Sequence, residues 1–139
     1  MNESIRHELA PTGALRAVIN LGNPVLAQGT ADAPSGITVD LARALGAELE
    51  VPVELVCVDA ARKSVDAIAT GAVDVGFVAV DPGRAEQLAF TEPYVLIEGM
   101  YAVPGDSAIG GVDDVDRPGV RIGAKLGSAY DLHLTRHLR

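Results

Sequence analysis

Three short apolar runs separated by two amphipathic segments constrain the fold of this chain more than any other feature. The runs are Leu15–Ile19, Val51–Val58 and Asp74–Val80, and their lengths suit strands. Between them, Thr38–Leu49 and the stretch from Asp59 to Thr70 repeat apolar side chains every three or four residues, as helices do. The order strand, helix, strand, helix, strand predicts an α/β fold with a parallel sheet and right-handed crossovers.

A turn and an arginine follow the third apolar run. The run is almost unbroken, which is typical of a strand covered on both faces, and Pro82 and Gly83 end it. Arg84 therefore lies near the carboxyl end of a strand, where open α/β sheets bind ligands. A guanidinium there either grips a carboxylate or is solvated or paired with an acid such as Glu86. The position alone favours the second alternative.

Downstream of Arg84 the pattern predicts two further strands and a helix. Tyr94–Val103 and Val120–Ala124 are apolar, and a helix is expected from Ser128. Pro104–Asp106 lies between them and suits a hinge or a crossing between domains.

Composition argues against several classes of function. Eleven Lys and Arg residues against nineteen Asp and Glu residues give a net charge of −8, so we expect neither nucleic acid nor an anionic membrane as a partner. No run approaches the ~18 apolar residues of a membrane helix. The first residues lack the apolar core of a signal peptide, so either export is absent or a leader is missing here. Cys57 is the single cysteine and is expected to be a small core residue.

The remaining motifs that could form a catalytic, metal-binding or anion-binding site are weak. The sequence has no dinucleotide-binding glycine motif, Walker A loop, zinc-protease motif or nucleophile elbow. His133 and His137 could face one metal, but no third ligand lies nearby, and we expect no metal and no cofactor. Gly127 and Ser128 open the last helix, and Asp131 completes a capping box with Ser128. Such a start either binds an anion or is simply capped, and these residues alone favour capping.

Taken together, the order of these pieces resembles the family 3 extracellular solute-binding proteins, the periplasmic amino-acid receptors of ABC transporters. The resemblance spans Leu15 to about Leu134 and rests on the Asn23-Pro24 loop, SGITVDLARALGAEL, DAIATGAVDV, RAEQLAFTEPY and VRIGAKLGSAYD. It implies a type II periplasmic-binding-protein-like fold: a three-layer αβα lobe with a mostly parallel sheet, plus a fragment of a second lobe. The expected domains are an N-terminal tail (1–14), lobe 1 (15–103), and a hinge with a partial lobe 2 (104–139).

The resemblance also implies roles for individual residues. In that family the arginine after the third strand binds the ligand's carboxylate, and a glycine followed by Ser or Thr at the first helix of lobe 2 binds it too. Here the loop before the arginine is short, Asn20 stands where an acid is common, and Asn23 where an aromatic is common. These departures favour a small carboxylate-bearing solute over a standard α-amino acid as the ligand. The expected ligand-binding residues are Arg84, Asp81, Asn20, Asn23, Val80, Gly127 and Ser128.

Three functions are compatible with these residues. The leading hypothesis is the substrate-binding component of an ABC-type importer, which binds an amino acid or similar small carboxylate without catalysis and docks on the ABC permease. A dehydratase-like enzyme, with Asp81 or Glu98 moving protons, and a ligand-sensing domain are the alternatives. The family implies a periplasmic location, and the missing signal peptide leaves a cytoplasmic one open. With half of lobe 2 absent, we expect weak ligand binding and a homodimer through apolar surface around Ile122 and Leu134.

Overall fold

The computed structural model describes residues 3–139, which divide into two compact units between Phe90 and Thr91. The first unit holds every strand of the described chain, and the second holds one longer helix and extended segments. The sequence places the end of lobe 1 later, at Val103, and that lobe boundary stays a prediction. Each unit is described by itself.

The first unit is built on a parallel sheet of three strands in the order β4-β1-β5. The strands are β1 (Leu15–Asn20), β4 (Val53–Val58) and β5 (Val75–Gly76), and Ala17 of β1 lies level with Leu55 and with Val75. The strand order and direction confirm the predicted α/β class. The central strand is almost completely buried, because neighbours lie on both of its sides and helices on both of its faces.

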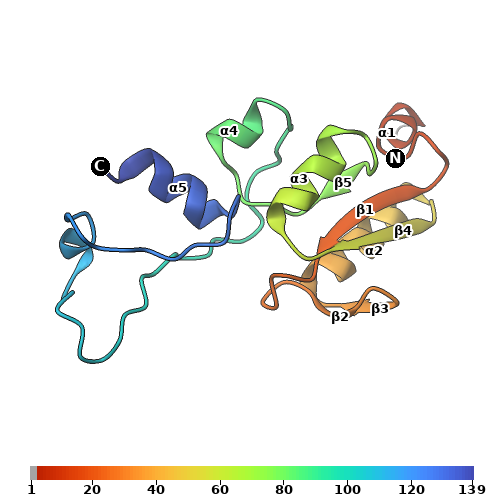
Figure 1. Cartoon of the computed structure of the whole chain (residues 1–139). Helices are drawn as coiled ribbons and strands as arrows, with labels where there is room; N and C mark the ends of the chain where they lie inside the picture. The colour runs from red at the N-terminus through yellow and green to blue at the C-terminus, as the bar shows by residue number, and fades with distance from the viewer. Residues whose placement is uncertain (1–2) are drawn as a thin grey trace. The chain divides into compact units, whose positions relative to one another are not determined.

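Helices α2 (Ile37–Leu49) and α3 (Ala61–Ala69) cover opposite faces of this sheet (Figure 1). Val39 and Ala42 of α2 pack in one buried cluster with Ala17 and Ile19, which alternate along one face of β1. On the other face, a Cβ added at Gly76 would lie 2.6 Å from Ile68 of α3 and equally close to Val18 of β1. The lobe is therefore the predicted three-layer αβα arrangement.

The helix boundaries agree with the sequence to within a residue or two. Asp59, a residue type that often caps helices, instead forms an ion pair of 2.8 Å with Lys63, and Ala60 takes the N-cap position of α3 without a side-chain hydrogen bond. At the other end of α3, Thr70 is the C-cap and Gly71 adopts the left-handed φ of +73° that suits glycine after a helix.

Two segments contain elements that the pattern did not predict. The expected N-terminal tail contains helix α1 (Glu3–Leu9), and the loop after β1 contains an antiparallel hairpin of β2 (Gln28–Thr30) and β3 (Ala33–Ser35). The hairpin lacks alternating apolar residues and is almost wholly exposed, so hydrophobic periodicity carries no signal for it.

The third apolar run is a much shorter strand than predicted. Only Val75 and Gly76 pair with β1, and the chain from Phe77 to Val80 is extended without a ladder before the four-residue helix α4 (Pro82–Ala85). Val80 is 59% exposed. The predicted strand length is wrong, because only Val75 and Gly76 find ladder partners, although α3 contacts Gly76 and the buried cluster of α2 contacts Val75 and Phe77 on the other face.

In the second unit the strands predicted at Tyr94–Val103 and Val120–Ala124 do not form. Both segments lack partner strands within residues 91–139, where the regular elements are the 3₁₀ turn η1 (Val112–Asp114) and helix α5 (Ala129–His137). An apolar pattern indicates residues that favour a strand, but the strand forms only where a neighbour completes its hydrogen bonds. Across residues 3–139, no helix combines the length and apolar character needed to cross a membrane.

Candidate functional site

Asp81 starts helix α4 and orders the turn that carries Arg84. Its Oδ1 accepts hydrogen bonds from the backbone N–H groups of Gly83, at 2.9 Å, and of Arg84, at 3.4 Å. Pro82 occupies the first helical turn, where its missing N–H costs nothing. Asp81 is 3% exposed, so its carboxylate is built into the turn. The Asp81-Pro82 pair is the sequence signal that could have predicted this cap.

The Arg84 side chain is buried at this turn, with 5% of its surface exposed. Its Nη1 donates a 2.9 Å hydrogen bond to the carbonyl oxygen of Ala79, so the side chain folds back along the segment that leaves β5. Burial lowers the pKa of the Arg84 guanidinium, and the charge of Asp81 opposes that shift. Water screens the attraction between opposite charges poorly in such a buried position.

The loop after β1 is ordered by two asparagine side chains. Asn20 Oδ1 accepts from the N–H of Gly22 at 3.0 Å, and Asn23 Oδ1 accepts from the N–H of Val25 at 3.3 Å. The loop packs closely on the end of β4, since a Cβ added at Gly22 would lie 2.1 Å from the carbonyl oxygen of Asp59. Both asparagines are half-buried.

Topology brings these residues to one edge of the sheet. The three strands are parallel, so the carboxyl ends of β1 and β5 lie at the same end of the sheet, which is called its carboxyl edge. Asn20 ends β1 and Asn23 follows in the next loop, whereas Asp81 and Arg84 follow the carboxyl end of β5. Five predicted site residues of the first unit therefore lie at the edge where open α/β sheets bind ligands: Asn20, Asn23, Val80, Asp81 and Arg84.

Gly127 and Ser128 lie in the second unit, at the start of α5. Ser128 Oγ accepts from the N–H of Asp131 at 3.2 Å, as in the predicted capping box. The reciprocal bond differs from the prediction, because the Asp131 carboxylate accepts from the N–H of Gly127, at 2.7 Å, rather than from that of Ser128. The groups expected to bind an anion are thus bonded within their own helix start.

The other candidate groups in the second unit do not form a metal site with three protein ligands. The rings of His133 and His137 stack with their centroids 4.1 Å apart, and His137 Nδ1 lies 2.7 Å from the carbonyl oxygen of His133. Within residues 3–139 no three His, Cys, Asp or Glu residues are placed to hold a metal ion together. Glu98, the alternative proton carrier, is exposed on the extended segment.

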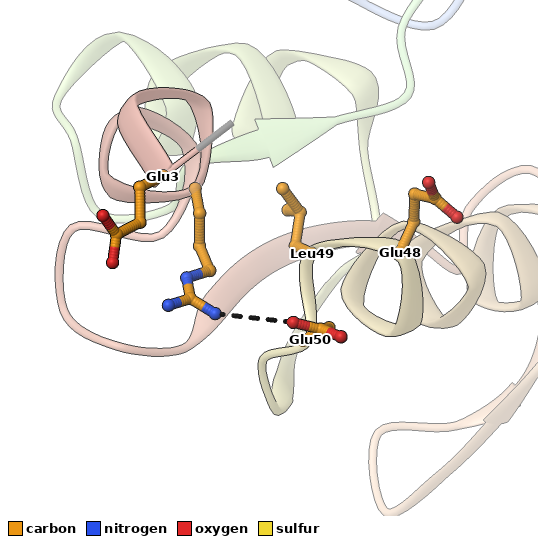
Figure 2. Close-up of a pocket in the computed structure, with 5 residues that line it drawn as sticks. Glu3, Glu48, Leu49 and Glu50 are labelled. Atoms are coloured by element: carbon orange, nitrogen blue, oxygen red, sulfur yellow. Dashed lines mark ion pairs between the residues drawn. The ribbon is translucent and has the colours of Figure 1, made fainter. Parts of the chain in front are cut away.

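A shallow polar hollow of about 180 Å³ lies at the other end of the first unit (Figure 2). Arg6 of α1 and Glu50 at the end of α2 line it and form a 3.8 Å ion pair across it. Glu50 precedes β4, so this hollow lies toward the amino ends of the strands, away from the edge that carries Arg84.

Comparison with known proteins relates this chain to a family. The model of the bacterial extracellular solute-binding proteins, family 3, matches residues 17–134. No curated protein matches the sequence.

Several solved structures share the fold, which is that of type II periplasmic binding proteins. A putative binding component of an ABC transporter from Wolinella succinogenes, complexed with lysine, is 20% identical with a TM-score of 0.68, over 91% of this chain and 56% of that chain. An ancestral cationic amino acid solute-binding protein is 24% identical with a TM-score of 0.58, over 96% of this chain and 60% of that chain. An ancestral cyclohexadienyl dehydratase is 24% identical with a TM-score of 0.56, over 68% of this chain and 40% of that chain.

The chain thus spans between 40% and 60% of the length of these three structures. Together with the match over residues 17–134, the parallel αβα lobe establishes the family. This chain belongs to the bacterial extracellular solute-binding proteins, family 3.

Proposed function

We propose that this chain is the ligand-binding part of a substrate-binding component of an ABC-type importer. It binds an amino acid or a similar small carboxylate, does so without catalysis, and works in the periplasm with an ABC permease. The family match and the amino-acid-binding neighbours support this role. The observation that carries it is the buried Arg84, held at the carboxyl edge of a parallel sheet.

Arg84 anchors the carboxylate of the ligand in this proposal. A guanidinium carries five N–H donors in one plane and matches the two oxygens of a carboxylate. Asp81 acts as a positioning residue, because it caps the turn that carries Arg84. Its charge also stabilises the buried guanidinium, which burial alone would disfavour.

The structure of the turn favours binding over proton transfer. The dehydratase-like alternative uses Asp81 or Glu98 as a proton carrier, but Asp81 Oδ1 already accepts two backbone hydrogen bonds and the residue is buried. A carboxylate in that arrangement orders a turn. A ligand-sensing role shares the same binding chemistry and differs only in the partner.

Calorimetry on the full chain tests the proposal, with L-lysine, L-glutamate, L-alanine and 2-oxoglutarate as probes. We expect weak binding, with a dissociation constant above about 1 µM, since only part of the family's length is present. Arg84→Lys keeps the charge but loses the planar fork, and we expect affinity to fall at least about tenfold. Arg43→Gln, an exposed change on α2, is the control and leaves affinity unchanged. An Arg84→Lys variant that binds every probe like the parent chain rules out the anchor.

Two changes at Asp81 separate positioning from direct ligand contact. Asp81→Asn keeps an oxygen acceptor for the turn, whereas Asp81→Ala removes it. If Asp81 acts by capping, Asn preserves most of the ligand affinity and Ala does not. Equal loss in both variants, with unchanged thermal midpoints, would indicate that the carboxylate itself contacts the ligand.

A homodimer is the second part of the proposal. Ile122 and Leu134, expected to supply its surface, are half-buried, whereas Leu96, Met100 and Leu126 are among the most exposed large apolar side chains. We place the dimer surface on the segment Tyr94–Val103, because its extended backbone lacks a partner strand within residues 91–139. Light scattering should give a mass that rises with concentration, and Leu96→Lys should abolish the rise. A monomer at every concentration would contradict this part.

A further inference from the structure

Two histidines on helix α5 form a pair. His133 and His137 lie four residues apart, so they are neighbours on one face of the helix. Their rings stack with the centroids 4.1 Å apart and the planes inclined by 24°. Both side chains are exposed. The helix therefore presents two adjacent imidazoles to the solvent.

A hydrogen bond determines which nitrogen of His137 remains available. Its Nδ1 lies 2.7 Å from the carbonyl oxygen of His133, and a carbonyl oxygen only accepts. Nδ1 therefore carries the hydrogen, and Nε2 of the neutral ring keeps its lone pair. Histidines that bind metal ions in proteins are commonly held in this way, with the second ring nitrogen donating to a backbone carbonyl. The bond thus leaves His137 with Nε2 as a metal-binding atom.

The distance between the rings suits the chelation of one ion. An imidazole nitrogen lies about 2.0–2.1 Å from Zn²⁺, so two of them on the same ion are about 3 Å apart. The centroids at 4.1 Å are near that separation, and exposed side chains adjust by rapid rotation. No group of three His, Cys, Asp or Glu residues within 3–139 is placed to hold an ion, so water would complete the coordination.

We infer that His133 and His137 form an exposed two-ligand chelate for a divalent transition-metal ion such as Zn²⁺. Imidazole is a preferred ligand of Zn²⁺, Cu²⁺ and Ni²⁺, whereas Mg²⁺ and Ca²⁺ prefer oxygen. The carboxyl end of α5 favours a bound cation, and the charge of Arg136 in the same turn opposes it. The site departs from the expectation of no metal, which counted a third protein ligand as necessary. It is separate from the proposed ligand binding and does not depend on it.

Calorimetry with ZnCl₂ on the full chain, carrying no added histidines, tests the inference. We expect one Zn²⁺ per chain at the tightest site, and MgCl₂ to bind at least about tenfold more weakly. His133→Ala and His137→Ala should each weaken Zn²⁺ binding at least about tenfold, because two linked ligands bind far more tightly than one. Unchanged affinity in either variant overturns the inference.

Two matched controls isolate the pair. His7→Ala removes the remaining histidine of the chain, an exposed residue of α1, and should leave Zn²⁺ affinity unchanged. Thr135→His combined with His137→Thr keeps the composition but sets the histidines two residues apart, where side chains on a helix do not face each other. We expect this double variant to bind as weakly as His133→Ala. Affinity equal to that of the parent chain would show that the pairing is not the source.

Hydrogen exchange in the parent chain provides a test that needs no variant. The N–H of Leu138 donates to the carbonyl oxygen of Leu134 at 3.0 Å, in the turn that carries His137. A chelate joins His133 to His137 and so opposes opening of this turn. With Zn²⁺ at about ten times its dissociation constant, exchange at Leu138 should slow at least about fivefold. Zn²⁺ binding without this change places the ion elsewhere and overturns the inference.

Arg84→Lys separates this site from the proposed ligand site. It should weaken carboxylate binding and leave Zn²⁺ affinity as it is, because the two histidines do not include that anchor. Thermal midpoints without metal check that each variant keeps its fold. Loss of Zn²⁺ binding in Arg84→Lys at an unchanged midpoint would show that the ion does not bind at the histidine pair, and would overturn the inference.

Discussion

Arg16 and Asp74 join strand β1 to the start of β5 through a two-pronged ion pair. Arg16 Nη2 lies 2.6 Å from Asp74 Oδ1, and Arg16 Nε donates to Asp74 Oδ2 at 3.0 Å. The backbone adds two bonds, from the N–H of Arg16 to Oδ2 at 2.8 Å and from the N–H of Asp74 to the carbonyl oxygen of Arg16 at 2.9 Å. Since β5 pairs over only two residues, this contact stabilises the strand that leads to Arg84.

Asp74→Asn should destabilise the first unit and change its response to acid. Burial alone would raise the pKa of Asp74, but the hydrogen bonds and charge of Arg16 lower it below its ordinary value. The ionised pair therefore stabilises the fold above the unfolded pKa of about 3.9, and this contribution is lost as pH falls through the folded pKa. We expect Asp74→Asn to lower the free energy of unfolding by about 1–3 kcal/mol at pH 7. The loss should be smaller at pH 3.

Urea unfolding at both pH values measures this effect. Asp32→Asn, in the exposed hairpin, is the control and should change stability by less than about 0.5 kcal/mol. An equal loss for Asp74→Asn at pH 3 and pH 7 would show that the ionised pair is not the source.

Gly46→Ala should be destabilising through a single identified contact. A Cβ at Gly46 of α2 would lie 2.1 Å from Val53 Cγ2 of β4, and 3.2 Å from the carbonyl oxygen of Val51. Overpacking of this kind costs about 1–3 kcal/mol. Val53→Ala removes the clashing methyl group. The double variant should therefore lose less free energy of unfolding than the two single variants lose in total. A double-mutant cycle by urea unfolding measures this difference. Strictly additive losses would contradict the predicted contact between Gly46 and Val53.

Ser64→Ala should leave stability unchanged or increase it. Ser64 on α3 is 1% exposed, and its hydroxyl oxygen has no hydrogen-bond partner among the described residues. Alanine removes that unpaired polar group and has the higher helix propensity, so we expect a gain of up to about 1 kcal/mol. Thermal and urea unfolding measure it. A loss beyond about 1 kcal/mol would reveal that the hydroxyl has a stabilising partner.

Ser128→Ala should loosen the start of α5. Its Oγ accepts from the N–H of Asp131, and loss of an N-cap costs about 1 kcal/mol. Hydrogen exchange at the Asp131 amide should accelerate in Ser128→Ala and stay near the parent rate in Ser128→Asn, which keeps a capping oxygen. Unchanged exchange in the alanine variant would leave capping without support and favour the ligand-binding role predicted for this residue.

The sequence was sufficient to predict those elements whose stability is encoded locally. Apolar positions every three or four residues predicted α2 and α3, and Ser128 with Asp131 predicted the start of α5. The buried run at β1 and the order of elements predicted a parallel αβα lobe, because parallel strands need such crossovers. The strands expected at Tyr94–Val103 and Val120–Ala124 were wrong, since a ladder depends on a neighbour that no local pattern supplies.

At the candidate site the division is similar. The order of residues along the chain was enough to predict which of them follow each strand, and so which share an edge: Asn20 after β1, and Asp81 and Arg84 after β5. Their chemical roles depend on contacts made in the folded chain. The tertiary structure committed Asp81 to the turn, buried the Arg84 guanidinium beside it, and fixed the asparagine oxygens on backbone N–H groups, because hydrogen-bond partners and burial are set by contacts that form in the folded chain.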